Sequence, residues 1–133
     1  MWPEPIERIA AFLRASNVEG QLEELPPGTS SAPGTALRAE GFDSGTRPLV
    51  ALVPAKRRID SVKLARAAPV ARLREAPAPP FPFEHARVLV ERSLFAERVV
   101  WLPVGSGRYV LGLAPQHVAR LTRGETADLL VAD

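Results

Sequence analysis

The sequence LVALVP at residues 49–54, followed by AKRRIDSVKL at residues 55–64, decides how this chain folds. An unbroken apolar run that ends in proline predicts a strand buried on both faces. The cations that follow cannot be buried, so the strand should end at the surface, and Asp60 should cap a helix at residues 61–68. A strand that delivers lysine and arginine to a helix N-terminus suits phosphate. The alternative is a surface corner whose charges are merely solvated.

The overall composition is that of an ordinary globular protein, and we expect a single domain over residues 1–133. Hydrophobic residues make up 46% of the 133 residues and charged residues 24%. The formal net charge is only +2, so nucleic-acid binding would need a local basic patch. The apolar runs are too short to span a bilayer, and the N-terminus (MWPE) lacks the pattern of a secretory signal. We therefore expect a cytoplasmic protein that does not bind membranes.

The sequence excludes several kinds of chemistry. Cysteine is absent and there are only two histidines, His85 and His117. Disulfides and thiolate nucleophiles are thus excluded, and no metal site or cofactor is expected. No P-loop, dinucleotide fingerprint or serine–histidine–aspartate order is present. His85 could act as a general base, although exposed surface positions explain both histidines more simply.

Short strands interspersed with short helices predict an α+β fold with a mixed sheet. Strands 35–40 and 47–54 should form a hairpin across residues 41–46. The run EAPAPPFPF at residues 75–83 should be extended and packed through Phe81 and Phe83. Helices are also expected at residues 6–14 and 115–122, and strands at 18–25, 70–74, 88–91, 99–102, 109–114 and 126–131.

Several short motifs, in their order along the chain, resemble the YbaK family. These proteins are aminoacyl-tRNA deacylases that also occur as the editing domain of bacterial prolyl-tRNA synthetases. The resemblance implies an α+β fold around a mixed, barrel-like sheet. It also implies trans-editing hydrolysis of the ester between tRNA and a wrong small amino acid such as alanine, cysteine or proline. The partners would be mischarged tRNA and an aminoacyl-tRNA synthetase. The similar segments are PLVALVP (48–54), RRID (57–60), VLVERSL (88–94), VGSGR (104–108), LGLAP (111–115) and residues 122–129.

Two loops are the expected substrate-binding elements. Gly105, Ser106 and Gly107 can present successive backbone N–H groups to an anion, because glycine permits the required backbone angles. The alternative is that these residues form a plain hairpin turn. Thr29 and Ser30 could add hydroxyl groups, although loop hydroxyls commonly cap turns.

Other side chains are candidates for contact with tRNA itself. Trp101 and Tyr109 could stack on the terminal adenine, but core positions in adjacent strands explain them more simply. A basic run should bind tRNA phosphates through a salt-sensitive contact, and one of its members could reach into the cleft. This run consists of Lys56, Arg57, Arg58 and Lys63.

The sequence differs from the family pattern in two places. Residues 34–36 (GTA) stand where the family has a lysine at the start of a strand, and residues 76–78 (APA) replace a Gly-Gly pair. Pro77 has no N–H to donate to an oxyanion. These differences favour an alternative function, in which a catalytically inactive module of this fold binds tRNA or another ligand. They leave the catalytic residue unassigned.

Overall fold

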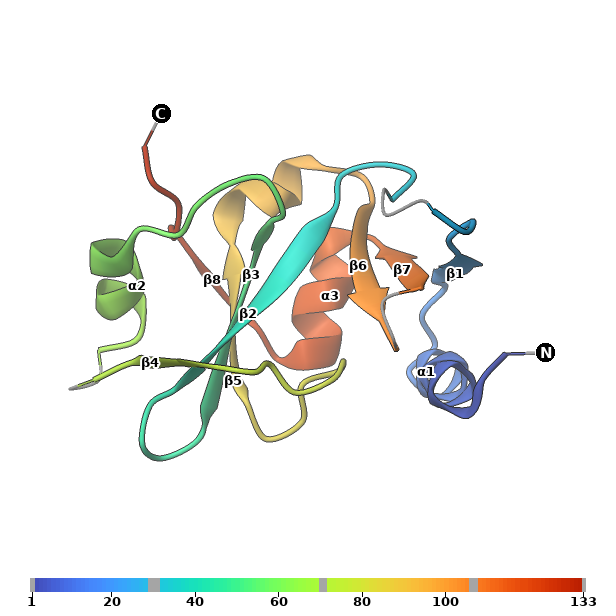
Figure 1. The fold of residues 1–133 in the computed structure, drawn as a ribbon, viewed down its shortest axis with the longest axis horizontal. Coiled ribbons are helices and arrows are strands. Elements are labelled where there is room, and N and C mark those ends of the chain that lie inside the picture. Colours follow the sequence, from blue (N-terminus) through green and yellow to red (C-terminus); the bar gives the residue numbers. More distant parts are fainter. Residues whose placement is uncertain (1, 29–31, 70–71, 106–107, 133) are drawn as a thin grey trace.

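The computed structural model describes residues 2–28, 32–69, 72–105 and 108–132, and Figure 1 shows how their helices and strands are arranged. The predicted α+β class is confirmed. The helices are α1 (Glu4–Ala15), α2 (Ser61–Ala67) and α3 (Pro115–Thr122), with a 3-10 turn, η1 (Arg92–Ala96). The strands are β1 (Gln21–Glu24), β2 (Leu37–Asp43), β3 (Pro48–Pro54), β4 (Arg74–Ala76), β5 (Arg87–Glu91), β6 (Val100–Val104), β7 (Tyr109–Leu113) and β8 (Glu125–Ala127).

The described strands lie in two sheets, so the expected barrel-like sheet is wrong. The larger sheet has the order β4-β2-β3-β5-β8 and the smaller has the order β1-β7-β6. The larger sheet is mixed, because β3, β5 and β8 run parallel while β2 and β4 run antiparallel to their neighbours. An isolated bridge between Ala36 and Trp101 is where the sheets meet. The ladder does not continue from there along β2 and β6, so the sheets stay separate.

Strand β3 is buried on both faces, as its sequence predicts. Residues 49–53 are each at most 2% exposed. Because side chains alternate across a strand, β3 serves two apolar clusters. Val50 and Leu52 join the cluster that contains the apolar residues of α1, whereas Leu49, Ala51 and Val53 pack with those of α2. Burying one such side chain stabilises the fold by about 1.5–3 kcal/mol.

The helix signals in the sequence act as predicted. Asp60 caps α2, since its Oδ1 accepts hydrogen bonds from the backbone N–H groups of Val62 (2.8 Å) and Lys63 (3.2 Å). Proline lies in the first turn of both α1 and α3. Phe81 and Phe83 are buried, so the proline-rich segment packs against the fold as expected. The segment is not extended throughout, because residues 81–85 form a turn in which the Phe83 N–H donates to the Pro80 carbonyl oxygen. None of the described helices has the length and apolar character to cross a membrane.

Several strand boundaries differ from prediction. Strand β2 continues through Asp43, because Gly41 lies against β4, where a Cβ atom would be 2.5 Å from the Ala76 carbonyl oxygen. The strand expected at 70–74 is β4 instead, and Val70 and Ala71 lie outside the described residues. The strands expected at 18–25 and 126–131 are the shorter β1 and β8. β1 pairs with β7 over only four residues, and beyond β8 the chain pairs with Ile59 through Leu130.

Candidate functional site

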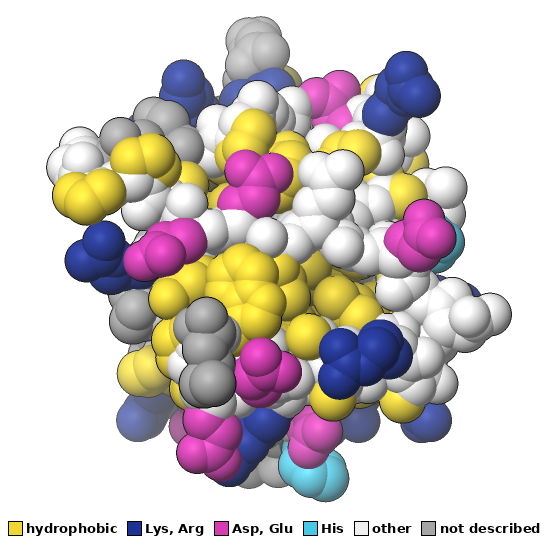
Figure 2. Space-filling model, turned by 90° about the vertical axis from the view of Figure 1, so that its right-hand side faces the viewer, with side chains coloured by type: hydrophobic (Ala, Val, Ile, Leu, Met, Phe, Trp, Pro, Cys, Tyr) yellow, Lys and Arg dark blue, Asp and Glu magenta, His cyan; other side chains and the backbone are white. Residues whose placement is uncertain are grey.

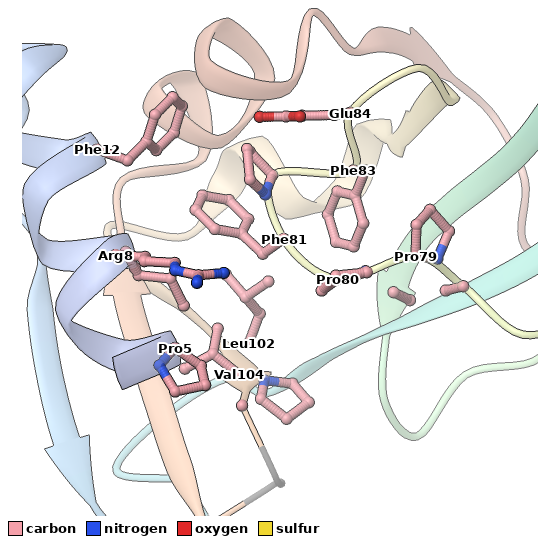
Figure 3. Close-up of a pocket in the computed structure, with 16 residues that line it drawn as sticks. Pro5, Arg8, Phe12, Pro79, Pro80, Phe81, Phe83, Glu84, Leu102 and Val104 are labelled. Carbon is pink, nitrogen blue, oxygen red and sulfur yellow. The ribbon is translucent and has the colours of Figure 1, made fainter. Parts of the chain in front are cut away.

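A pocket of about 640 Å³ lies between α1, the proline-rich segment at residues 78–84 and the end of β6 (Figure 3). Its wall is mostly apolar and includes Phe12, Phe81 and Phe83. The rings of Phe12 and Phe81 meet edge to face at 6.0 Å, and those of Phe81 and Phe83 at 5.8 Å. The two phenylalanines of the segment therefore form one side of the pocket and leave its volume open.

Turn geometry holds the proline-rich segment in place. The Phe83 N–H donates to the Pro80 carbonyl oxygen at 2.8 Å, and the peptide bond between Phe81 and Pro82 is cis. Phe83 has a φ of 61°, which is unusual for a residue other than glycine. Proline restricts the backbone here, so the aromatic side chains have defined positions in the wall.

The charged side chains in the described wall are Arg8 and Glu84. Figure 3 shows Arg8 extending from α1 over the pocket, with Glu84 beyond Phe83. Arg8 Nη2 also lies 2.5 Å from Glu4 Oε1, and these side chains are 77% and 75% exposed. An exposed helix pair of this kind contributes only about 0.3–0.5 kcal/mol. The guanidinium of Arg8 can therefore leave Glu4 for a stronger partner at little cost.

Helical spacing provides a signal for Arg8 that the sequence prediction missed. Pro5, Arg8, Ile9 and Phe12 all line the pocket. They are spaced by three, one and three residues, which places them on one helix face. Arg8 is thus the cation within an otherwise apolar face.

The structure places one residue of the predicted glycine loop in the pocket wall. Gly105 follows β6, has a φ of 62° and lines the pocket. A Cβ atom added there would lie 3.0 Å from Ile6 Cδ1. β6 and β7 pair antiparallel up to Val104 and Tyr109, so the loop also connects a hairpin. Ser106, Gly107, Thr29 and Ser30 lie outside the described residues.

No lysine lines the pocket among the described residues. Within residues 34–36, where the family resemblance expects a lysine, the Thr35 hydroxyl hydrogen-bonds to the Glu97 carboxylate. The backbone of Thr35 is also engaged, since its carbonyl oxygen accepts from the Trp101 N–H at 2.9 Å.

The predicted basic residues Lys56, Arg57, Arg58 and Lys63, here called the basic corner, lie where β3 leads into α2 and do not line the pocket. Arg57 Nη2 donates to the Val131 carbonyl oxygen at 3.2 Å. Lys63 Nζ pairs with Asp128 Oδ1 at 3.1 Å. Asp60 already accepts from two N–H groups at the start of α2. Lys56 and Arg58 are exposed. That the corner binds tRNA stays a prediction.

A second depression, of about 610 Å³, adjoins the pocket. Arginines from three separate elements line it: Arg47 from the turn before β3, Arg87 from β5 and Arg123 from the end of α3. We call it the arginine groove. His85, one of the two histidines, lies in its lining and is exposed.

One arginine of the groove is paired. Arg87 donates to both carboxylate oxygens of Glu125, at 2.8 and 3.3 Å. These hydrogen bonds hold the pKa of Glu125 below its ordinary value, although burial acts to raise it, and the positive charges of Arg87 and Arg47 also lower it. The same bonds raise the pKa of Arg87. Arg87 is thus neutralised by Glu125.

The remaining candidates belong mainly to the packing of the fold. Trp101 is 6% exposed and lies in the core. Tyr109 is partly buried and its ring meets that of Trp2 edge to face at 5.7 Å. His117 is partly buried rather than exposed, and its Nδ1 atom has no hydrogen-bond partner in the described part of the chain. Within that part, no three histidine or acidic side chains are grouped so that they could hold a metal.

The face of the molecule on which α1 and β1 lie is apolar at its centre. Figure 2 shows a continuous patch of hydrophobic side chains there, with acidic and basic side chains around it. This face therefore does not present a field of cations to a polyanion.

Comparisons with known proteins show the fold. A provisionally assigned trans-editing enzyme for prolyl-tRNA synthetase matches with a TM-score of 0.82 and 20% identity, over 99% of this chain and 100% of that one. A scaffold protein from computational epitope grafting matches with a TM-score of 0.83 and 19% identity, over 99% of this chain and 100% of that one. The hypothetical protein APE2540 matches with a TM-score of 0.79 and 15% identity, over 93% of this chain and 99% of that one. No protein-family model and no curated protein sequence matches the chain.

Proposed function

We propose that this chain hydrolyses the ester of mischarged aminoacyl-tRNA that carries a small amino acid, with the aminoacylated 3′ end bound in the pocket. The observation that carries the proposal is the open pocket with Gly105 and Arg8 in its wall. The fold shared with the provisionally assigned trans-editing enzyme supports it. The order of short motifs that resembles the YbaK deacylases supports it as well.

The proposed reaction uses water as the nucleophile, since the described wall contains no serine, threonine, cysteine or histidine. Water adds to the ester carbonyl carbon and the bond between that carbon and the ribose oxygen breaks. The products are the free amino acid and tRNA with its terminal hydroxyl restored. Negative charge develops on the carbonyl oxygen, and groups that meet this charge lower the barrier. Arg8 is our candidate for this role.

Two matched variants test the role of Arg8. Arg8→Gln removes the cation, and Glu4→Gln breaks the same ion pair but keeps the cation. We expect kcat/KM for deacylation to fall on the order of tenfold or more in R8Q, because a donor to the developing charge is lost. Deacylation by E4Q should stay close to wild type. Equal rates in R8Q and wild type would remove Arg8 from the mechanism.

The reaction itself is tested on tRNAs mischarged with alanine, cysteine or proline. We expect the wild-type chain to accelerate at least one deacylation over the reaction in buffer alone. Binding of these tRNAs without any acceleration would contradict hydrolysis.

A specific observation favours the second candidate, a binding module without catalytic activity. Residues 34–36 stand where the family resemblance expects a lysine, and the Thr35 hydroxyl among them is bonded to Glu97. Such a module would bind tRNA or another ligand without accelerating deacylation. The same deacylation series therefore separates the two candidates.

A further inference from the structure

The arginine groove adjoins the pocket, and its position bears on how tRNA would reach that pocket. We infer that the groove binds phosphates of tRNA close to its aminoacylated 3′ end, an inference that rests on the proposed function. The basic corner, which the sequence favours for this contact, would then lie away from the bound strand.

The groove forms where three parallel strands begin. Arg47 immediately precedes β3, Arg87 is the first residue of β5, and Arg123 ends α3 just before β8. Figure 1 shows the β2–β3 turn and the loop before β5 side by side at the lower edge of the molecule. Parallel pairing of β3 with β5 and of β5 with β8 brings the starts of these strands together. Arginines up to 76 positions apart in sequence thus line one depression.

Two of the three arginines are available for a ligand. Arg47 and Arg123 are exposed, and within the described residues neither side chain forms a hydrogen bond or a close ion pair. Arg47 acts on Glu125 only through its charge, while Arg87 already holds that carboxylate. The groove therefore offers two guanidinium groups, and guanidinium binds phosphate oxygens in a forked geometry.

The groove is continuous with the pocket. Phe12, Pro82, Phe83 and Glu84 line both depressions. The basic corner shares no lining residue with the pocket in the part of the chain that is described. It lies at the opposite end of β3, and seven residues of strand span about 20–24 Å. A nucleic acid whose 3′ end fills the pocket would therefore reach the groove before it could reach the basic corner.

The backbone around the groove is held in costly conformations. Phe83, His85 and Arg123 have φ values of 61°, 67° and 55°. A residue other than glycine in such a conformation is strained and persists where the surroundings hold it. Next to Arg123, Gly124 packs closely against β5, since a Cβ atom there would lie 2.6 Å from Val90 Cγ2. Backbone hydrogen bonds position Arg123 at the end of α3, from the Arg123 N–H to the Arg120 carbonyl oxygen at 3.3 Å and from the Gly124 N–H to the Ala119 carbonyl oxygen at 2.8 Å.

Two double variants, each with two exposed cations removed, test the inference. R47Q/R123Q removes the two arginine charges that Glu125 does not pair with and leaves the Arg87–Glu125 pair intact. K56Q/R58Q removes the same charge at the other end of β3. Binding of uncharged tRNA is measured at KCl concentrations between roughly 50 and 200 mM, together with deacylation of aminoacyl-tRNA. Each lost contact with a single strand lowers the slope of log K against log salt by about 0.7, so two contacts lower it by about 1.4.

We expect R47Q/R123Q to bind tRNA on the order of tenfold more weakly at low salt, with the reduced salt slope. K56Q/R58Q should bind like wild type. R47K/R123K keeps both charges and should regain the salt slope and part of the affinity, which separates lost charge from a folding defect. An equal loss in both neutralised variants, a larger loss in K56Q/R58Q, or no tRNA binding by the wild type would overturn the inference.

The inference and the proposed function can fail separately. If the wild type binds tRNA through the groove but accelerates no deacylation, the inference stands and the hydrolytic function is wrong. If deacylation is rapid and unaffected in R47Q/R123Q at low substrate concentration, the function stands and the groove is not the phosphate site.

Discussion

The two ends of β3 both carry cations, but they use them differently. At the carboxyl end, the basic corner binds the C-terminal part of the chain through Arg57 and Lys63. Backbone hydrogen bonds reinforce this contact, from Asp60 to Leu129 at 2.8 Å and from Val131 to Arg58 at 2.9 Å. At the amino end, Arg47 and Arg123 point from different elements into one groove and have no such internal partner among the described residues.

This difference shows that a run of cations in the sequence is a poor guide to available charge. Cations that are close in sequence are also close in space, so a single segment from elsewhere in the chain can pair with several of them. Scattered cations can converge without any signal in the local sequence. We therefore expect changes at the corner to affect stability and changes at the groove to affect tRNA binding.

The largest effect is expected at Glu91, which ties the corner end of the sheet together. Glu91 is 1% exposed, and its carboxylate accepts from the backbone N–H groups of Ser93 (2.6 Å) and Leu129 (3.0 Å). Glu91→Ala leaves both donors without a partner, so the free energy of unfolding should fall by about 2–4 kcal/mol. Urea denaturation measures the change. Glu91→Gln, which keeps one acceptor oxygen, should lose less, and a loss in E91A of under about 1 kcal/mol would contradict this role.

A smaller effect is expected at the helix cap of the corner. Asp60→Ala removes the acceptor for the first N–H groups of α2, so unfolding should become easier by about 1 kcal/mol. Asp60→Asn can still cap and is the control. Thermal unfolding gives the stability, and tRNA affinity should stay unchanged in both variants. A loss of tRNA affinity in D60A would show that the corner, rather than only the fold, depends on this cap.

The smallest effect is expected from the Arg87–Glu125 pair in the groove, whose side chains are 28% and 56% exposed. The pair lowers the pKa of Glu125. Its stabilisation is therefore present above the ordinary glutamate pKa of about 4.3 and lost as the pH falls through the lower folded value. At pH 7, Glu125→Gln should cost about 0.2–1 kcal/mol in urea unfolding at low salt. The difference from wild type should vanish in acid, and a difference that grew on acidification would contradict the assignment.

Much of the fold could be predicted from local sequence signals. The apolar run of β3, the cap at Asp60 and the prolines at the starts of α1 and α3 act within a few residues of themselves. Strand ends were less predictable, because they depend on partners from elsewhere. Gly41, expected in a turn, is in strand β2 because β4 lies directly against it.

The candidate site was predictable only in part. Gly105, which the sequence predicts as a substrate-binding residue, lines the pocket, whereas Arg8, within the helix expected at residues 6–14, was not predicted as a site residue. Arg8 faces the pocket because the proline-rich segment and the end of β6 pack beside α1. Helical spacing puts Arg8 on the same face as Pro5, Ile9 and Phe12, but nothing in the sequence around Arg8 indicates which distant segments pack there.

By itself, the sequence determined the α+β class, the buried β3, the helix starts and the packing role of Phe81 and Phe83, since periodicity, proline and capping act over short distances. Tertiary structure decided that the strands form two separate sheets. It also decided that Arg57 and Lys63 hold the C-terminal segment, and that Arg47, Arg87 and Arg123 converge beside the pocket. These outcomes depend on strand pairings between distant residues, and pairing over such distances leaves no local pattern in the chain.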